Sequence, residues 1–105
     1  MWPTTLAIVE DDAAFAELLA GDLQRRGIVV KVYSDSNELL ADPMAFDHEF
    51  YVIDVSLPGI SGTDLIRILR RRSMAGVLVV TGHLAPEVFS SVLEAGADMY
   101  LAKPV

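Results

Sequence analysis

The sequence contains no cysteine among its 105 residues. This absence excludes disulfide bonds, thiol catalysis and any zinc site built on thiolates. Histidine is nearly as scarce, because His48 and His83 are the only two, which is too few for a histidine-rich metal site. Basic residues number eight against fifteen acidic ones, so the formal net charge is −7. A chain this acidic repels a phosphate backbone, and we do not expect it to bind nucleic acid directly.

Long apolar runs are also missing, although 52% of the residues are hydrophobic. No run approaches the roughly 18–20 apolar residues that a membrane-spanning helix requires. The N-terminal MWPTTLAIVEDD has no basic segment of the kind that opens a secretory signal. We therefore expect a cytoplasmic protein without membrane contact. The length predicts one domain over residues 1–105, and the hydrophobic content suits a sheet buried on both faces.

Short apolar runs alternate with helical patterns along the chain. The pattern predicts strands over residues 6–9, 28–33, 50–53, 77–80 and 99–101. Most of these runs are apolar throughout, which is typical of a parallel sheet covered on both sides. Apolar spacing and capping residues predict helices over residues 13–26, 36–42, 62–72 and 86–96. This alternation predicts an α/β fold with a doubly wound, open parallel sheet.

Polar residues follow most of the predicted strands, at the edge where such sheets bind their ligands. The residues at these strand ends are Glu10, Asp11, Asp12, Asp54, Thr81 and Lys103. Because the carboxyl ends of parallel strands meet at one edge, we expect these side chains to converge there. Taken alone, each has a simpler interpretation, such as a solvated lysine or a strand-end hydroxyl.

The three acids at 10–12, taken alone, are most simply a solvated cap at the start of a helix, where carboxylates favour the helix dipole. Asp54 shifts this interpretation, because a lone carboxylate at the end of an apolar strand is costly to bury. Several carboxylates at one edge repel one another unless a cation joins them. Oxygen ligands of this kind suit Mg²⁺. With the cation of Lys103 and the hydroxyl of Thr81, the set describes a phosphoryl-transfer site.

Four sequence pieces carry a resemblance to a known family. They are EDD at 10–12, DVSLPGISG at 54–62, TGH at 81–83 and GADMYLAKP at 96–104. In their order and spacing they resemble the receiver domain of two-component response regulators, over nearly the whole chain. The resemblance implies a flavodoxin-like sheet of five strands in the order 2-1-3-4-5.

The resemblance also implies roles for the acids. Asp54 would be the phosphoacceptor, taking a phosphoryl group from a histidine kinase or a histidine phosphotransfer protein. Asp11, Asp12, Asp54 and the backbone carbonyl of Ser56 would hold Mg²⁺. We favour Asp12 as the more direct ligand and treat Glu10 as a less critical flanking acid.

The resemblance implies that the other matched positions contact the phosphoryl group, transmit its presence to the surface or set its lifetime. Lys103 would pair with the phosphoryl oxygens, and its bond to Pro104 would be cis. Thr81 would donate to a phosphoryl oxygen and Tyr100 would be the switch aromatic. Ser56 and His83 occupy positions that tune the lifetime of the phosphoryl group. Such a domain is not an enzyme in the usual sense: it catalyses only its own phosphorylation and dephosphorylation and regulates an output domain or a downstream protein, often in transcription.

Two departures from the family pattern stand out. Met99 replaces the second acid of the family's GADDY stretch, which argues against one salt-bridged dimer of transcriptional regulators. The family continues past its Lys-Pro with a fifth helix, whereas this sequence stops at Val105. We therefore expect four of the usual five helices, no output domain, and self-association into a homodimer through the sheet face that the fifth helix would cover.

Two other functions remain open. A degenerate receiver can act as a phosphorylation-independent interaction module, although such modules usually lose the acceptor, the acid pair or the lysine. A hydrolase that forms an aspartyl phosphate, as in the haloacid dehalogenase-like phosphatases, needs a second acid two residues after the nucleophile. That position is Ser56 here.

Overall fold

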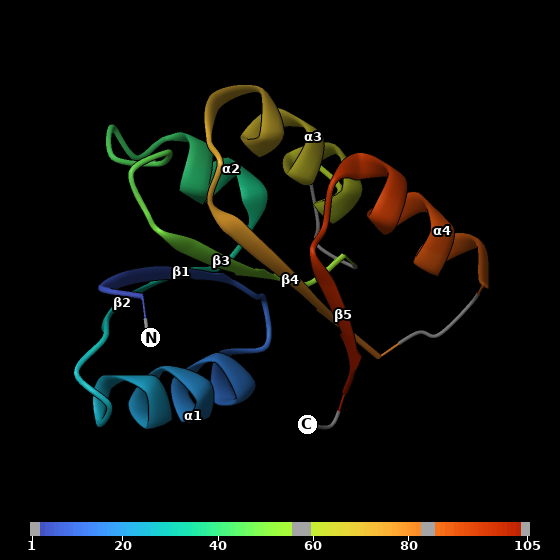
Figure 1. The fold of residues 1–105 in the computed structure, drawn as a ribbon. Helices are drawn as coiled ribbons and strands as arrows, with labels where there is room; N and C mark the ends of the chain where they lie inside the picture. Colours follow the sequence, from blue (N-terminus) through green and yellow to red (C-terminus); the bar gives the residue numbers. More distant parts are fainter. Residues whose placement is uncertain (1–2, 56–59, 83–85, 104–105) are drawn as a thin grey trace.

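Five parallel strands form a single sheet (Figure 1) in the computed structural model, which describes residues 3–55, 60–82 and 86–103. The strands are β1 (Thr5–Val9), β2 (Val29–Tyr33), β3 (Phe50–Ile53), β4 (Gly76–Thr81) and β5 (Met99–Ala102). Their order in the sheet is β2-β1-β3-β4-β5, which confirms the order expected from the sequence. Every pair is parallel, so all five carboxyl ends lie at one edge.

Four helices connect the described strands: α1 (Ala13–Gln24), α2 (Ser36–Leu40), α3 (Gly62–Arg72) and α4 (Pro86–Ala95). The predicted caps are present, because Asp35 accepts from the N–H of Glu38 and Ser61 accepts from that of Asp64. Helices α1 and α2 end about two residues earlier than expected. Among these described helices, none is long and apolar enough to cross a membrane.

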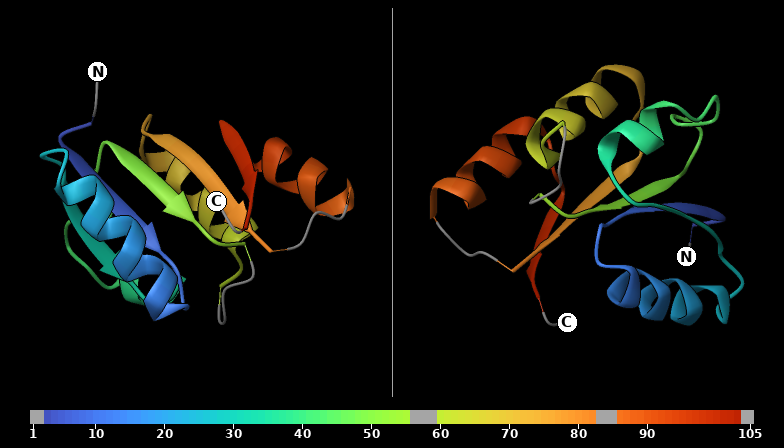
Figure 2. Two further views of the ribbon diagram at one scale, coloured as in Figure 1. Left: turned by 90° about the horizontal axis from the view of Figure 1, so that it is seen from below. Right: turned by 180° about the vertical axis from the view of Figure 1, so that it is seen from behind.

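The two faces of the sheet are covered unequally. Helices α2, α3 and α4 lie on one face, whereas α1 alone lies on the other (Figures 1 and 2). Beside α1, ten residues, most of them aliphatic, line an apolar groove of about 280 Å³ that includes Leu19, Phe50, Val80 and Leu101. The self-association expected through this face stays a prediction, which sedimentation of the chain at micromolar concentration tests.

A second group of ionisable side chains lies where β2 meets the connection between α2 and β3. The Tyr33 hydroxyl donates to Asp42 Oδ2 at 2.6 Å and lies 3.0 Å from His48 Nε2. Lys31 Nζ lies 2.7 Å from the same Asp42 oxygen. We call Lys31, Tyr33, Asp42 and His48 the Tyr33 cluster. Because its partners hold one another, it fastens β2 to the chain that leads into β3.

Candidate functional site

Three buried polar side chains stand at the carboxyl edge of the sheet. Glu10 follows β1 directly and is 3% exposed, and Asp54 follows β3 directly and is 5% exposed. The N–H of Asp54 donates to the carbonyl of Val9 at 3.0 Å, so the β1–β3 pairing continues to this point and sets the two acids side by side. Thr81, the last residue of β4, is fully buried.

Lys103 joins these elements. Its ammonium Nζ lies 2.5 Å from Glu10 Oε1 and 3.2 Å from Asp54 Oδ2. Its backbone N–H donates to the carbonyl of Thr81 at 2.8 Å, which fixes where the side chain starts. The structure thus brings the Asp54 carboxylate, the Lys103 ammonium and the backbone of Thr81 together, although the sequence placed them on separate strand ends.

The pKa values at this edge reflect one cation among several acids. Burial raises the pKa of Glu10 from its ordinary 4.5 to about 7, although the hydrogen bond from Lys103 opposes the shift. Burial lowers the pKa of Lys103, but its hydrogen bonds to Glu10 and Asp54 outweigh burial, and the net pKa is raised. Lys103 therefore stays charged at neutral pH.

A third carboxylate completes a group that can hold a metal ion. Glu10, Asp11 and Asp54 each offer a carboxylate oxygen, and these oxygens lie within 4.8 Å of one another. We call these three residues the acid pocket. Asp11 is exposed, whereas the other two acids are buried. A cation would therefore enter the acid pocket from the Asp11 side. An all-oxygen set that leaves room for water fits Mg²⁺.

Asp12, expected to be the more direct metal ligand, is used differently. Its Oδ1 accepts the backbone N–H of Phe15 at 3.1 Å, so the carboxylate caps the first turn of α1. Its own N–H donates to Glu10 Oε2 at 3.1 Å. The structure therefore groups Glu10 and Asp11, not Asp12, with Asp54. The physical reason is that Asp12 occupies the N-cap position, where a carboxylate meets unpaired backbone N–H groups.

Gly62 fixes the backbone beside Asp54. A Cβ at this position would lie 2.5 Å from the Cα of Val55 and 2.8 Å from the carbonyl oxygen of Asp54. Only glycine allows the start of α3 to approach this closely, because any side chain would push the Asp54–Val55 backbone away. The last glycine of DVSLPGISG thus has a role in positioning the end of β3 at Asp54.

The remaining predicted site residues are distributed as follows. Tyr100 pairs with Val79 across β4 and β5, and its ring meets that of Phe89 in α4 edge-on, with centroids 5.0 Å apart. Ser56, His83 and Pro104 lie outside the described residues, so the metal-binding carbonyl, the lifetime positions and the cis bond stay predictions.

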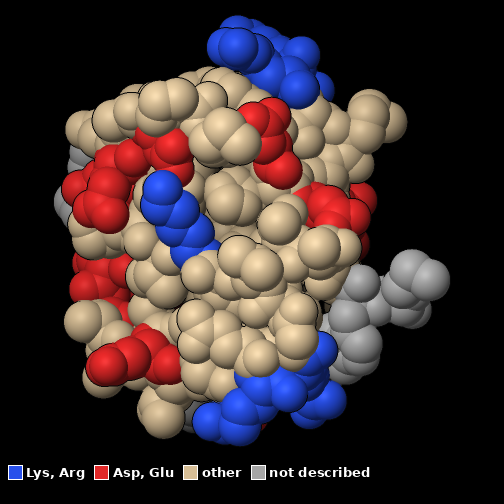
Figure 3. Space-filling model, turned by 90° about the vertical axis from the view of Figure 1, so that its left-hand side faces the viewer, with Lys and Arg blue, Asp and Glu red and all other residues tan. Residues whose placement is uncertain are grey.

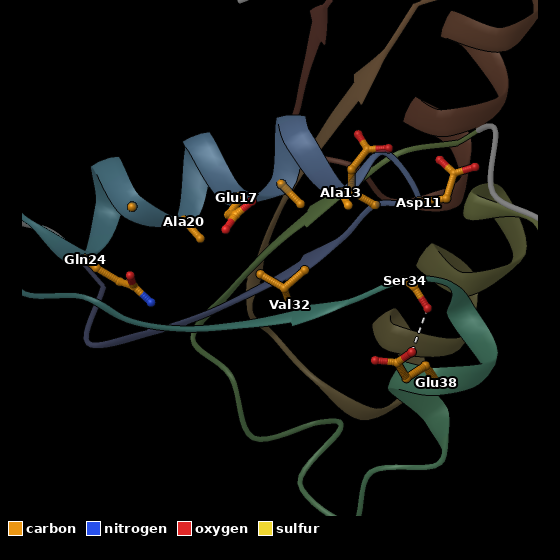
Figure 4. A pocket seen from close by; sticks show the side chains of 11 residues that line it. Asp11, Ala13, Glu17, Ala20, Gln24, Val32, Ser34 and Glu38 are labelled. Atoms are coloured by element: carbon orange, nitrogen blue, oxygen red, sulfur yellow. Dashed lines mark hydrogen bonds between the residues drawn. The ribbon is translucent and has the colours of Figure 1, made fainter.

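A groove of about 540 Å³ opens next to the acid pocket, between α1 and the edge strand β2 (Figure 4). Small residues of α1 form one wall, and Val32 and the hydrogen-bonded pair of Ser34 and Glu38 face them. Acidic side chains gather in patches on this side of the molecule, with basic groups toward its two ends and one beside an acidic patch between them (Figure 3). The sequence did not indicate this groove, because small residues on a helix predict packing as readily as a cleft.

Comparison with known proteins defines the class. The chain matches the response regulator receiver domain over residues 6–105 and belongs to that family. Receiver domains are the phosphoacceptor signalling domains of two-component systems and are not enzymes in the usual sense.

Two curated relatives are a sensory transduction protein and a two-component response regulator. The chain is 38% identical to the sensory transduction protein RegX3 of Mycolicibacterium smegmatis over 102 residues, which is 96% of this chain and 44% of RegX3. It is also 38% identical to the two-component response regulator PhoP of Pseudomonas aeruginosa over 100 residues, 94% of this chain and 44% of PhoP. The chain thus spans less than half the length of these relatives.

A solved structure of similar fold is a response regulator from Burkholderia pseudomallei with a phosphorylated aspartic acid, a calcium ion and citrate. It superposes with a TM-score of 0.89 at 34% identity, over 97% of this chain and 61% of that one. A receiver domain from Methanospirillum hungatei superposes with a TM-score of 0.88 at 28% identity, over 97% of this chain and 82% of that one.

Proposed function

We propose that this chain is a phosphorylation switch whose acceptor is Asp54 and whose donor is a phosphohistidine on a histidine kinase or phosphotransfer protein. The observation that carries the proposal is the contact of one ammonium, Lys103, with two buried carboxylates at the strand ends. A buried acid that contacts a cation and belongs to a group of three acids able to hold a metal ion is poorly explained as a structural device alone. The phosphorylated aspartic acid of the Burkholderia relative supports the same chemistry.

In the transfer step, a carboxylate oxygen of Asp54 forms a bond to phosphorus as the phosphorus–nitrogen bond of phosphohistidine breaks. The electron pair of the broken bond stays on the imidazole nitrogen of the donor. The donor leaves as neutral imidazole if its other ring nitrogen is protonated, and otherwise takes a proton from solvent. Lys103 reduces the repulsion between the incoming phosphoryl oxygens and Asp54, because its ammonium already lies 3.2 Å from Asp54 Oδ2.

Mg²⁺ would be held by Asp11 and Asp54, with Glu10 as the third acid and the Ser56 carbonyl as a further ligand. When bound, the ion cancels negative charge on the transferring phosphoryl group. Glu10 already gives both oxygens to protein donors, Lys103 Nζ and the N–H of Asp12. We therefore place Asp11, whose carboxylate is exposed, as the acid that binds the ion most directly.

The new phosphoryl group would change the surface around β4, β5 and α4. An aspartyl phosphate carries about two negative charges, and the Thr81 hydroxyl and the Lys103 ammonium are the donors at hand. Their backbones are already joined by a 2.8 Å hydrogen bond. Tyr100, in the adjoining strand, contacts Phe89 of α4 and would carry the change to that helix. We propose that an output domain or partner protein in the cytoplasm reads this surface.

Mass spectrometry tests the assignment after incubation with a small acyl phosphate, with Mg²⁺ and with a chelator. The expected result is one phosphoryl group per chain, dependent on Mg²⁺ and absent in Asp54→Asn. Asp64→Asn is a suitable control, because that acid is exposed at the start of α3 and should leave labelling unchanged.

The same experiment separates the alternatives. A folded wild-type chain that takes up no phosphoryl group in the presence of Mg²⁺ would indicate a phosphorylation-independent interaction module. In a companion assay with a small phosphate ester, steady turnover would indicate a hydrolase. Full labelling of Asp54→Asn would overturn the choice of acceptor.

A further inference from the structure

A half-buried phenylalanine lies against the cation of the site. The Nζ of Lys103 is 4.7 Å from the centroid of the Phe15 ring, within the range of an attractive contact between a cation and an aromatic face. Phe15 belongs to the first turn of α1 and packs against the apolar cluster beneath that helix. No sequence pattern singles it out, since an aromatic on the apolar face of a helix normally serves the core.

The Lys103 ammonium can donate three hydrogen bonds, and three neighbours surround it. Glu10 Oε1 takes one at 2.5 Å and Asp54 Oδ2 takes another at 3.2 Å. The Phe15 ring lies against the same nitrogen. The side chain of Lys103 is 20% exposed, so little water competes with these three neighbours.

The backbone of Phe15 is held by the acidic residues at positions 10–12. Its N–H donates to Asp12 Oδ1, and the N–H of Asp12 donates to Glu10 Oε2. A chain of contacts therefore runs from Glu10 through the Asp12 cap to Phe15 and back to Lys103. Asp12, the third acid of EDD, therefore contributes to the site by holding Phe15, even though Asp12 lies outside the acid pocket.

We propose that Phe15 is a positioning residue, whose ring holds the Lys103 ammonium at Asp54. A cation held by the acid pocket would compete with Lys103 for the negative charge of these carboxylates. The ring would then keep the ammonium within reach of Asp54, where incoming phosphoryl oxygens need it. An aliphatic side chain of similar size would fill the same space but would not attract the charge. The inference rests on the proposed phosphoryl transfer for its kinetic part only.

The first test is made on the unphosphorylated chain and does not depend on the function. The ammonium protons of Lys103, observed by NMR, should be shifted upfield by the ring and should lose that shift in Phe15→Leu. The matched control is Phe46→Leu, because the Arg72 guanidinium lies 4.3 Å from the Phe46 ring, far from the site in sequence and not among its contacts. Unchanged Lys103 signals in Phe15→Leu would overturn the proposal.

The second test measures the rate of phosphorylation of Asp54 by a small acyl phosphate. Phe15→Leu should react roughly three- to tenfold more slowly, the range expected from one contact of this kind. Phe15→Tyr should restore most of the rate, and successive fluorination of the ring at position 15 should lower it stepwise, because fluorine drains the negative charge of the ring face. Equal rates across the fluorinated series would show a role in packing only.

A double substitution separates this inference from the proposed function. In Lys103→Met, adding Phe15→Leu should cause no further slowing, because the cation that the ring attracts is gone. If Asp54→Asn abolishes labelling but Phe15→Leu slows the reaction equally with and without Lys103, the function stands and the positioning role fails. If wild type takes no label at all, the proposed function fails whatever the NMR of Lys103 shows.

Discussion

Two clusters of ionisable side chains in this molecule share the same ingredients but differ in balance. In the Tyr33 cluster, one lysine meets one carboxylate, Asp42, whose remaining oxygen accepts the N–H of Met44. At the carboxyl edge, one lysine meets two buried carboxylates, and the exposed Asp11 adds a third negative charge. The first cluster is electrostatically satisfied, whereas the second carries surplus negative charge.

The pKa values show the consequence of this difference. Hydrogen bonds from Lys31 and Tyr33 hold the pKa of Asp42 well below its ordinary value of 3.8. Burial raises the pKa of Glu10 to about 7. A satisfied cluster stabilises the fold and has no need of a ligand, whereas an unsatisfied one gains most from binding a cation. We therefore regard the Tyr33 cluster as structural and the carboxyl edge as the reactive site.

Removing charge from the acid pocket should have the largest effect on metal binding. We expect Asp11→Asn to weaken Mg²⁺ binding by at least the roughly 10–100-fold that loss of a supporting group costs other metal sites. Asp42→Asn, in the balanced cluster, should leave Mg²⁺ affinity unchanged. Isothermal titration calorimetry on both variants provides the measurement, and equal losses in the two would erase the distinction between the clusters.

Breaking the Tyr33 cluster should instead affect stability. Tyr33→Phe removes the hydroxyl that donates to Asp42. The Tyr33 side chain is only 1% exposed, so water cannot replace this hydrogen bond. We expect the free energy of unfolding to fall by about 1–3 kcal/mol, with phosphorylation of the folded protein unchanged. Urea denaturation followed by circular dichroism measures the loss. Lys31→Met is the control, because Lys31 is 58% exposed and its ion pair should contribute less.

The two clusters should also respond to pH in opposite directions. The pKa of Glu10 is about 7 in the folded chain and near 4.5 when unfolded, so the folded state binds more protons between these values and stability falls as pH rises through this window. The pKa of Asp42 is lowered on folding, so its contribution is present above pH 3.8 and is lost as pH falls below it. Burial likewise lowers the pKa of His48 below its ordinary 6.5, so stability falls as pH drops below that value.

A substitution at Glu10 separates its effect on the pH dependence of stability from that of the Tyr33 cluster. With metal removed by a chelator, Glu10→Gln should gain stability relative to wild type as pH rises from about 4.5 to about 7, because the glutamine has no proton to lose. Thermal melts across this range provide the comparison. A stability difference that does not change with pH would contradict the raised pKa of Glu10.

The smallest of these effects should come from the Asp12 cap. Asp12→Ala should reduce the free energy of unfolding by about 0.5–2 kcal/mol, the usual cost of losing an N-cap, and should affect Mg²⁺ binding far less than Asp11→Asn. A larger loss of Mg²⁺ affinity in Asp12→Ala than in Asp11→Asn would restore the ligand choice favoured from the sequence. Titration calorimetry and urea denaturation of the pair decide between the two.

Much of this arrangement could be predicted from the sequence because strand ends are easy to locate. Apolar runs fix β1, β3 and β4, and parallel pairing then requires Asp54, Thr81 and Lys103 to share one edge. The choice among Glu10, Asp11 and Asp12 could not be made in the same way. Adjacent residues after a strand point in different directions, and their directions depend on where the next helix starts.

The N-cap preference is the sequence signal that bears on that choice, since Asp12 immediately precedes the predicted helix start. The Tyr33 cluster had no such signal. Its members Lys31, Asp42 and His48 come from a strand, a turn and a loop, and only the folded chain shows that they meet. The contact of Phe15 with Lys103 spans nearly the whole sequence and was invisible for the same reason.

The central claim is that surplus negative charge at the carboxyl edge, and not in the Tyr33 cluster, marks the phosphoryl acceptor. Trapping the acyl phosphate by borohydride reduction, followed by peptide mapping, locates the modified carboxylate directly. The account predicts a single reduced residue, Asp54, formed with Mg²⁺ and absent when a chelator is present. Modification at Asp42, at Glu10 or at Asp11, or modification of Asp54 to the same extent without a divalent cation, would contradict it.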